Sequence, residues 1–288
     1  MTNALEIRNL RKTYKGFALK DVSFDLPQGT IMGLVGPNGA GKTTIIKSIL
    51  NIVRRDAGEI LIYGQDNRSE EKAVKTRIGF VHETPGLVED APLKNIAAAV
   101  APFYPSWDAG LFKRLVGEFE LPLEKKFKKL SHGMKMKFAL SLALAHDADL
   151  LILDEPTSGL DPVFRREFLA RLSAFIQDEG KAVLFSTHIT TDLERIADFI
   201  TLIRDGEIMF SAPKDDILGS WAVVKGGPEL LRDDYRGLFR GIRKRDFGVQ
   251  ALTDNAAETR RRLGREAVVE NAGLEDIMFY LTKGNGHA

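Results

Sequence analysis

The fold of this chain is decided by one stretch of sequence, Gly36-Pro37-Asn38-Gly39-Ala40-Gly41-Lys42-Thr43. It matches G-x-x-x-x-G-K-[ST], a loop that cradles phosphate groups when it lies between a buried strand and a helix. An apolar run at 31–35 precedes it, and a helix-like run at 44–50 follows it. Glycines let backbone N–H groups turn toward phosphate oxygens, and the helix directs its positive end at the same anion. The stretch therefore predicts a nucleoside triphosphate site in which Lys42 contacts the β- and γ-phosphates and Thr43 offers a hydroxyl to Mg²⁺.

The composition is that of an ordinary globular protein with a sizeable core. Of 288 residues, 44% are hydrophobic and 28% charged, and the formal net charge is only +1. This balance gives no overall electrostatic attraction to nucleic acid or to a membrane. The absence of cysteine excludes disulfides, cysteine metal sites and thiol nucleophiles. Residues 1–7 lack the features of a signal peptide, and no apolar run approaches the length of about 18 residues that spans a bilayer.

Four short apolar runs each end in polar residues that can do chemistry. Residues 31–35 lead into the phosphate loop, and the others end at His82-Glu83, at Asp154-Glu155 and at Ser186-Thr187-His188. Such runs are typical of strands buried on both faces of a parallel sheet covered by helices. Because ligands of open α/β sheets bind beyond the carboxyl ends of the strands, we expect the four polar ends to converge on one nucleotide.

The rest of the chain predicts three further regions. Residues 7–26 have the pattern of antiparallel strands with a turn at 14–16, and the pattern becomes helical between 85 and 146. The helical face is marked by Trp107, Leu111, Leu115 and Phe119. Ser211-Ala212-Pro213 has the composition of a linker, followed by short strand candidates at 221–224, 249–252 and 267–269. We therefore expect a nucleotide-binding domain over 1–212, with a helical subdomain at about 86–146, and a small α+β accessory domain over 213–288.

A basic stretch lies in the predicted accessory domain, at Arg236, Arg240, Arg243, Lys244 and Arg245. Acidic residues interleave it, so a solvated surface is the first interpretation. A regulatory or dimer-supporting surface is the second, and contact with anionic lipid is the third.

The two carboxylates after the third apolar run can have separate roles in hydrolysis. Asp154 would hold Mg²⁺, and Glu155 would accept a proton from the attacking water as general base. Alone, either acid could simply cap a helix. His188 would orient the water and contact the γ-phosphate, although a lone histidine at a strand end is more often structural. Glu83 is an acceptor able to bind the metal or the water.

A second anion site is predicted at Leu130-Ser131-His132-Gly133-Met134. Ser131 is a good N-cap for the helical run that follows, and the simplest interpretation ends there. A capped helix start beside a glycine also offers exposed N–H groups, a hydroxyl and a positive dipole end to an anion.

The ordered motifs resemble the ATP-binding subunit of an ABC transporter over residues 1 to about 210. They are the phosphate loop, Leu-Ser-x-Gly-x at 130–134, Leu-Leu-Ile-Leu-Asp-Glu-Pro at 150–156, Ser-Gly-Leu-Asp at 158–161 and Ser-Thr-His at 186–188. The resemblance implies an α/β P-loop NTPase fold with a mainly parallel sheet, an antiparallel β subdomain and a helical subdomain. Residues 103–108 and 130–137 are similar to ATPases of small bacterial exporters of the acetoin-utilisation and bacitracin-resistance type.

The resemblance also implies roles for individual residues. Tyr14 matches the aromatic residue that stacks on adenine, and Gly36 to Thr43, with Thr44, match the nucleotide-binding loop. Asp154 matches the metal carboxylate, Glu155 the catalytic base and His188 the switch histidine. Ser131 and Gly133 match the signature that completes the site of the opposite subunit, and Asp161 matches an aspartate at the dimer interface.

Two departures from the family pattern stand out. Glu83 replaces the usual glutamine and adds a negative charge near the metal. His132 and Met134 replace glycine and glutamine of the signature, and leave Ser131 and Gly133 in place.

The resemblance predicts a head-to-tail dimer that sandwiches two ATP molecules with Mg²⁺, either a homodimer or a pair with a related ATPase subunit. A separate integral-membrane permease would hold this cytoplasmic protein at the inner face of the cell membrane, and no nucleic acid is expected. The alternative is a soluble ABC ATPase that acts on nucleic acid, ribosomes or protein assemblies. Such proteins commonly join two ATPase halves or insert long coiled coils, and this sequence has neither. A non-hydrolysing nucleotide sensor is a third interpretation, disfavoured because Asp154, Glu155 and His188 are all present.

Overall fold

The computed structural model describes residues 2–245 and 248–283. The chain divides into two compact units. The first comprises Met1–Ile189 and Thr201–Phe210, and the second comprises Thr190–Ile200 and Ser211–Ala288. The boundary at 212/213 stays a prediction.

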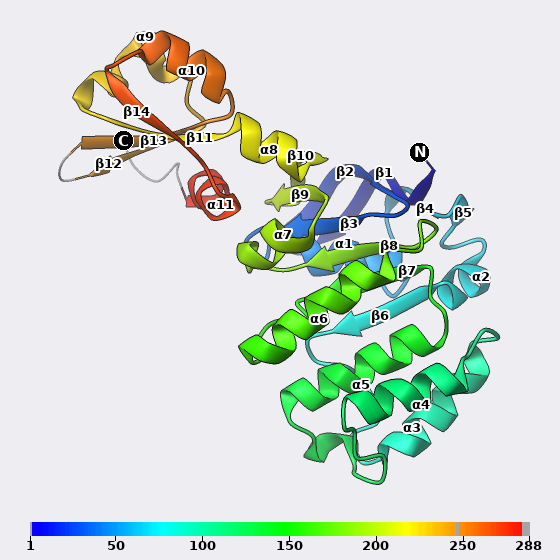
Figure 1. The fold of residues 1–288 in the computed structure, drawn as a ribbon. Helices are drawn as coiled ribbons and strands as arrows, with labels where there is room; N and C mark the ends of the chain where they lie inside the picture. The colour runs from blue at the N-terminus through cyan, green and yellow to red at the C-terminus, as the bar shows by residue number, and fades with distance from the viewer. Residues whose placement is uncertain (1, 246–247, 284–288) are drawn as a thin grey trace. The chain divides into compact units, whose positions relative to one another are not determined.

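A six-stranded sheet in the order β10-β9-β3-β8-β7-β6 forms the centre of the first unit (Figure 1). Its strands are β3 (Ile31–Val35), β6 (Ile78–His82), β7 (Leu150–Asp154), β8 (Ala182–Ser186), β9 (Phe199–Arg204) and β10 (Glu207–Pro213). β3, β8, β7 and β6 pair in parallel, and every residue of β3, β7 and β8 is buried. The prediction of four strands whose carboxyl ends share one edge is confirmed. Helices α1 (Lys42–Ile49) and α6 (Pro162–Phe175) lie beside this sheet (Figure 1).

A second sheet of the same unit has the order β2-β1-β4-β5. It contains β1 (Asn3–Tyr14), β2 (Phe17–Pro27), β4 (Ala57–Ile62) and β5 (Gln65–Asp66), and α2 (Glu71–Thr76) follows it. β1 and β2 pair antiparallel, with Tyr14 opposite Phe17, so the predicted turn is confirmed.

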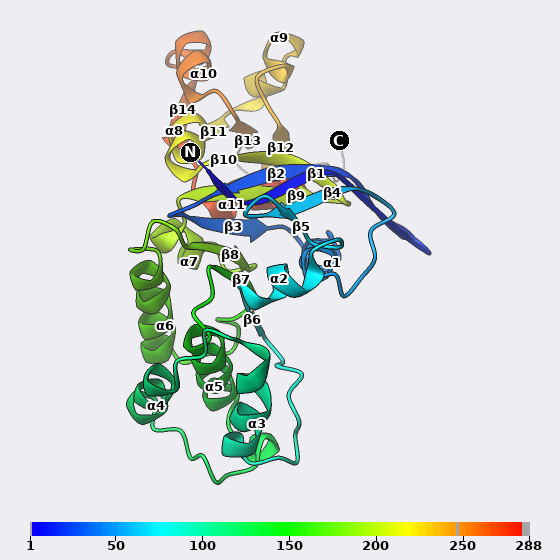
Figure 2. The same ribbon diagram turned by 90° about the vertical axis from the view of Figure 1, so that its right-hand side faces the viewer.

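The helical region begins after the Glu83 segment. It consists of α3 (Leu93–Val100), η1 (Ala101–Phe103), α4 (Ala109–Glu118), η2 (Phe127–Lys129) and α5 (His132–Ala145). α3, α4 and α5 lie side by side in both views (Figures 1 and 2). Leu115 and Phe119 are buried as the helical spacing predicted, whereas Trp107 lies before α4.

The second unit contains a four-stranded antiparallel sheet in the order β12-β13-β11-β14. Its elements are α7 (Thr190–Ile196), α8 (Lys214–Ser220), β11 (Ala222–Gly226), η3 (Pro228–Leu231), α9 (Asp233–Arg236), β12 (Gly241–Arg245), β13 (Gly248–Thr253), α10 (Ala256–Leu263), β14 (Ala267–Asn271) and α11 (Leu274–Lys283). The order of β11 to β14 with the intervening helices is that of a split β-α-β unit. The three predicted strands are confirmed, and β12 was missed because its basic residues suggested only a charged surface.

One prediction in the connecting segment is wrong. Ser211–Pro213 is not a linker but the end of β10, in which exposed and partly buried residues alternate. Proline is tolerated there because β10 is the edge strand of its sheet and the residue closes it. Among the described residues, no helix is long and apolar enough to cross a lipid bilayer.

Candidate functional site

The phosphate loop joins β3 to α1 in a conformation that requires glycine. Gly41 caps α1 at φ 118°. A Cβ on Gly36 would lie 2.3 Å from the carbonyl oxygen of Ile203, and one on Gly41 would lie 2.9 Å from Cζ of Phe17. Because backbone and ring occupy that space, larger residues would displace the loop from the start of α1.

Lys42 is folded back over this loop. Its Nζ donates to the carbonyl oxygens of Gly36 at 2.8 Å and Pro37 at 3.4 Å, and lies 3.7 Å from Oε1 of Glu155. Burial lowers the pKa of Lys42, while Glu155 and Asp154 oppose that shift. The loop therefore holds a cation against its own carbonyl oxygens, at the place where the sequence predicted the β- and γ-phosphates.

Asp154 stands at the end of β7 with both carboxylate oxygens engaged. Oδ2 accepts a hydrogen bond from Oγ1 of Thr43 at 3.0 Å, and Oδ1 accepts one from Oγ of Ser186 at 2.8 Å. Nε2 of His82 lies 3.6 Å from Oδ2. The Asp154 residue is only 2% exposed, so these contacts fix the carboxylate beside Thr43.

Glu155 and His188 form the second pair. Oε2 of Glu155 accepts hydrogen bonds from the backbone N–H of His188 at 3.2 Å and from its Nδ1 at 2.8 Å. An ionised carboxylate only accepts, so Nδ1 carries the proton and Nε2 is left to face solvent or substrate. Glu155 also adopts φ 50°, a left-handed conformation that costs a non-glycine residue energy and that clusters at functional sites.

Glu83 is brought close through its backbone. Its N–H donates to the carbonyl oxygen of Asp154 at 2.9 Å. Of the residues that the structure describes, none donates a hydrogen bond to the Glu83 carboxylate, so that carboxylate is available to a ligand.

The donor set around Thr43 and Asp154 fits a hard cation. Oxygen ligands, with one or two carboxylates and the phosphates of a substrate completing the shell, are what Mg²⁺ prefers. Within 2–245 and 248–283 no group of three His, Asp or Glu side chains could hold a metal ion unaided. Any divalent ion here would therefore depend on the nucleotide for part of its shell.

The signature segment, residues 130–134, lies at the start of a helix rather than at the end of a sheet strand. Ser131 caps α5, its Oγ accepting from the N–H of Met134 at 3.3 Å, which confirms the predicted cap. α5 begins directly after this cap, at His132. A Cβ on Gly133 would have no atom within 4 Å, so the packing of this chain does not require glycine there.

Asp161 and Tyr14 lie at the ends of other elements. Oδ1 of Asp161 caps α6, accepting from the N–H groups of Val163 at 3.1 Å and Phe164 at 2.9 Å. Tyr14 is 43% exposed at the end of β1, opposite Phe17, whose ring lies against the phosphate loop.

The structure thus assembles some of the predicted residues and leaves others apart. The assembled residues form a cluster in which Lys42 and His188 contact Glu155 and Thr43 contacts Asp154. In the described parts of the chain, no hydrogen bond or ion pair joins Tyr14, Ser131, Gly133 or Asp161 to that cluster.

Ser186 and His82 were expected among the strand ends that converge on the nucleotide, but neither was given a role of its own. Both stood at the ends of the apolar runs that the sequence analysis identified. Only the pairing of β7 with β8 and β6, which puts Asp154 opposite Ser186 and His82, shows that they reach its carboxylate.

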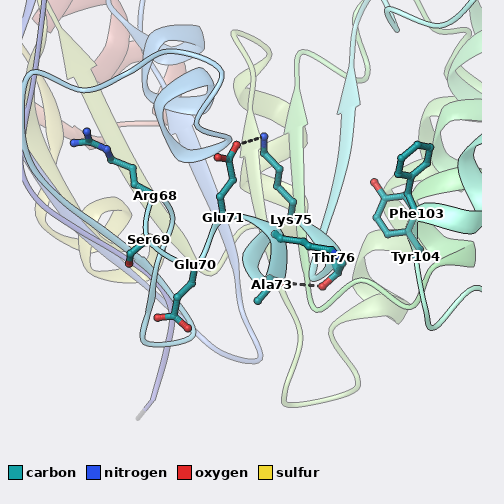
Figure 3. A pocket seen from close by; sticks show the side chains of 10 residues that line it. Arg68, Ser69, Glu70, Glu71, Ala73, Lys75, Thr76, Phe103 and Tyr104 are labelled. Atoms are coloured by element: carbon teal, nitrogen blue, oxygen red, sulfur yellow. Dashed lines mark hydrogen bonds and ion pairs between the residues drawn. The ribbon is translucent and has the colours of Figure 1, made fainter.

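A pocket of about 980 Å³ opens between α2 and the end of η1 (Figure 3). Figure 3 shows Phe103 and Tyr104 on one side, facing Lys75 and Thr76 of α2. Phe103 is 76% exposed. The remaining lining residues are Arg68, Ser69, Glu70, Glu71, Lys72 and Ala73.

Comparison with known proteins identifies the family. A family profile described as "ABC transporter" matches residues 19–158. An uncharacterised ABC transporter ATP-binding protein of Nostoc sp. is 35% identical over 282 residues, which cover 83% of this chain and 78% of the relative. The Nod factor export ATP-binding protein I of Burkholderia lata is 31% identical over 294 residues and 96% of each chain. A solved structure of an ATP-binding subunit of an ABC transporter has a TM-score of 0.69 at 30% identity, covering 74% of this chain and 91% of that one.

These likenesses confirm the predicted fold and the predicted ATPase activity. The chain therefore belongs to the ATP-binding subunits of ABC transporters, which bind and hydrolyse ATP.

Proposed function

We propose that two copies of this chain associate head to tail around two ATP molecules and drive a separate membrane permease. One observation carries this proposal. The strand-end cluster of Lys42, Thr43, Asp154 and Glu155 is assembled within one chain, whereas the exposed Ser131 and the neighbouring Gly133 stand apart from it at the start of α5. A second copy would bring its own signature segment to the ATP held by the first. A related ATPase subunit in place of the second copy is the alternative outcome of the experiment below.

Within each site, the nucleotide would lie along the phosphate loop. Backbone N–H groups of Gly39, Gly41 and Thr44 would face the phosphates, and Lys42 would exchange its carbonyl partners for phosphate oxygens. Tyr14, exposed beside the loop-facing Phe17, would stack on the base.

Hydrolysis needs a proton acceptor beside the attacking water. The Glu155 carboxylate is held by His188 and would take the proton as the water oxygen bonds to the γ-phosphorus and the bridging P–O bond breaks. The products are ADP and inorganic phosphate, and Lys42 would offset the charge that develops. Mg²⁺, held by Thr43 with Asp154 and Glu83 nearby, would polarise the phosphate oxygens when bound.

The signature segment would complete the site from the opposite side. Ser131 and the free N–H groups at the start of α5 would face the γ-phosphate of the other chain. The open space at Gly133 gives an incoming phosphate room to approach the backbone. Asp161, on the loop before α6, would lie at the dimer interface.

The pocket between α2 and η1 is the proposed docking place for the permease. Phe103 offers an exposed apolar anchor, and α2 offers charges of both signs, from Glu70 and Glu71 to Lys72 and Lys75. That combination suits a short amphipathic helix laid into a groove. Docking there would hold this protein at the cytoplasmic face of a membrane.

Export is the proposed direction of transport. The support is the likeness over 96% of each chain to a protein named as a Nod factor export ATP-binding protein. The finer placement among ATPases of the acetoin-utilisation and bacitracin-resistance type rests on residues 103–108 and 130–137.

The test is Mg²⁺-dependent ATP hydrolysis by the isolated chain, measured against protein concentration with Lys42→Ala as control. A rate per chain that rises with concentration, and is lost in the control, is expected for sites shared between two copies. A rate per chain that is independent of concentration would contradict them. Bound ATP without hydrolysis at any concentration would assign the second half-site to a related subunit.

A further inference from the structure

His132 connects the signature segment to the loop that carries the catalytic base of the same chain. It is the first residue of α5, next to Ser131, and its Nε2 lies 2.9 Å from the carbonyl oxygen of Ser158. A carbonyl oxygen only accepts, so Nε2 carries the proton and donates. The ring also packs on Gly159, since a Cβ there would lie 3.6 Å from Cδ2 of His132.

Ser158 belongs to a run of short turns that begins at Glu155. Its N–H donates to the carbonyl oxygen of Glu155 at 3.3 Å, and the N–H of Leu160 donates to that of Thr157 at 3.3 Å. The run ends at Asp161, which caps α6. Because the two turns share residues 157 and 158, we expect a shift of the Ser158 carbonyl to reach the backbone of Glu155.

The backbone of Glu155 has a conformation that such a shift can change. Its φ of 50° is held by the surrounding contacts rather than favoured by the residue itself. Its N–H is fixed to the carbonyl oxygen of Ser186 at 2.9 Å and its carboxylate to His188. We expect a small rotation at Ser158 to affect the Glu155 carboxylate more than β7, whose residues are all buried and paired to β8.

We propose that His132 is a positioning residue that couples the two ATP sites of the dimer. The inference rests on the proposed function, in which the signature of one chain meets the ATP of the other. An ATP that binds to Ser131 and Gly133 would then displace the start of α5. His132 would transmit that displacement to Glu155 of its own chain. Each site would sense the occupancy of the other through one hydrogen bond.

His132→Phe and His132→Gln separate this role from simple packing. Phenylalanine keeps a ring over Gly159 but cannot donate to the Ser158 carbonyl, whereas the glutamine amide can. The readouts are the ATP affinity of the dilute chain, the rate of hydrolysis as a function of ATP, and amide hydrogen exchange over residues 155–161.

We expect wild type and His132→Gln to hydrolyse ATP cooperatively, with a Hill coefficient of about 1.5 to 2 for two coupled sites. His132→Phe should bind ATP with unchanged affinity, show a Hill coefficient near 1, lose kcat several-fold, and exchange the Ser158 and Leu160 amides faster. A His132→Phe enzyme as cooperative as wild type would overturn the inference alone, as would a glutamine variant that behaves like the phenylalanine one. Wild-type hydrolysis that is neither cooperative nor dependent on protein concentration would overturn the proposed function and the coupling together.

Discussion

The strand ends of the central sheet and the start of α5 both offer positive groups to an anion, yet they differ in how far one chain completes them. At the strand ends, Lys42 and Asp154 are buried, and hydrogen bonds or ion pairs link them to the loop, to Thr43 and to Glu155. At the start of α5, Ser131 is exposed and Gly133 faces open space. In the proposed dimer, the strand ends are the half-site that one chain completes, and the start of α5 is the half-site that a second chain would use.

The largest effect on ATP hydrolysis is expected from removing the proton acceptor at the strand ends. Glu155→Gln should lower ATP turnover by about 10²- to 10⁴-fold, because an amide cannot accept the proton of water. ATP-driven dimerisation should persist, since the amide keeps the size of the side chain. Phosphate release and light scattering with ATP measure the two properties.

Glu179→Gln, at an exposed position away from the site, is the matched control and should hydrolyse ATP like wild type. A Glu155→Gln chain with wild-type turnover would show that Glu155 is not the base.

The start of α5 can be tested by a substitution that leaves the fold intact. Gly133→Ala should lower the ATPase rate by about 10²-fold, because a misplacement of about 1 Å at a reacting phosphate is enough for such a loss. The free energy of unfolding should stay the same or rise by up to about 1 kcal/mol, since alanine is favoured over glycine in a helix.

Gly117→Ala in α4 is a matched change, because Gly117 is also a helical glycine and a Cβ there would have nothing within 4 Å. It should gain similar stability and keep full activity. Equal activity in the two variants would mean that nothing approaches Gly133.

Ser131, at the start of α5, is exposed, whereas His146, at the other end of the same helix, is buried. His146 is 2% exposed and stacks on Tyr104 with ring centroids 4.0 Å apart. Burial lowers the pKa of His146 to about 4. The unfolded chain therefore binds a proton near pH 6.5 that the folded chain does not bind until about pH 4, so stability should fall as the pH falls through this window.

The expected loss is about 3 kcal/mol in the free energy of unfolding, from the size of the pKa shift. Denaturant titrations at several pH values measure it, and His146→Phe, which keeps a stacked ring but cannot titrate, should be less sensitive to pH by that amount. Parallel pH profiles for the two proteins would contradict the assignment.

The smallest effect concerns Ser186, to which the sequence analysis assigned no role of its own. Ser186→Ala removes a hydrogen bond to the buried Asp154 carboxylate, which should cost about 2 kcal/mol of stability and weaken the apparent affinity for Mg²⁺ several-fold. Thermal unfolding and the Mg²⁺ dependence of hydrolysis measure these losses.

Ser173→Ala in α6 is the control, because its hydroxyl donates to the carbonyl oxygen of Leu169 within the helix. If Ser186→Ala lost no more than Ser173→Ala, Asp154 would not depend on Ser186.

Most of the fold was predictable because buried parallel strands leave continuous apolar runs, as at 31–35 and 150–154. β12 was not, because Arg243 and Lys244 are exposed basic residues, which are untypical of a strand, and the strand is held by its pairing to β13. In the site, the phosphate loop and Asp154-Glu155 are local in sequence and could be recognised. The contacts of Ser186 to Asp154 and of His132 to Ser158 join segments 32 and 26 residues apart, and only strand pairing and the placement of α5 bring them together.

The most direct test of the shared site mixes two chains that are each defective in a different half. Glu155→Gln lacks the base but keeps its signature. Gly133→Asp keeps the base and puts a negative charge where a phosphate would approach, at a helix start that tolerates aspartate. Each alone should be inactive, and chains carrying the two changes, co-expressed and purified together, should recover about a quarter of wild-type activity, because half of randomly formed dimers hold one intact site of two. A mixture no more active than the sum of its parts would contradict a site built from two chains.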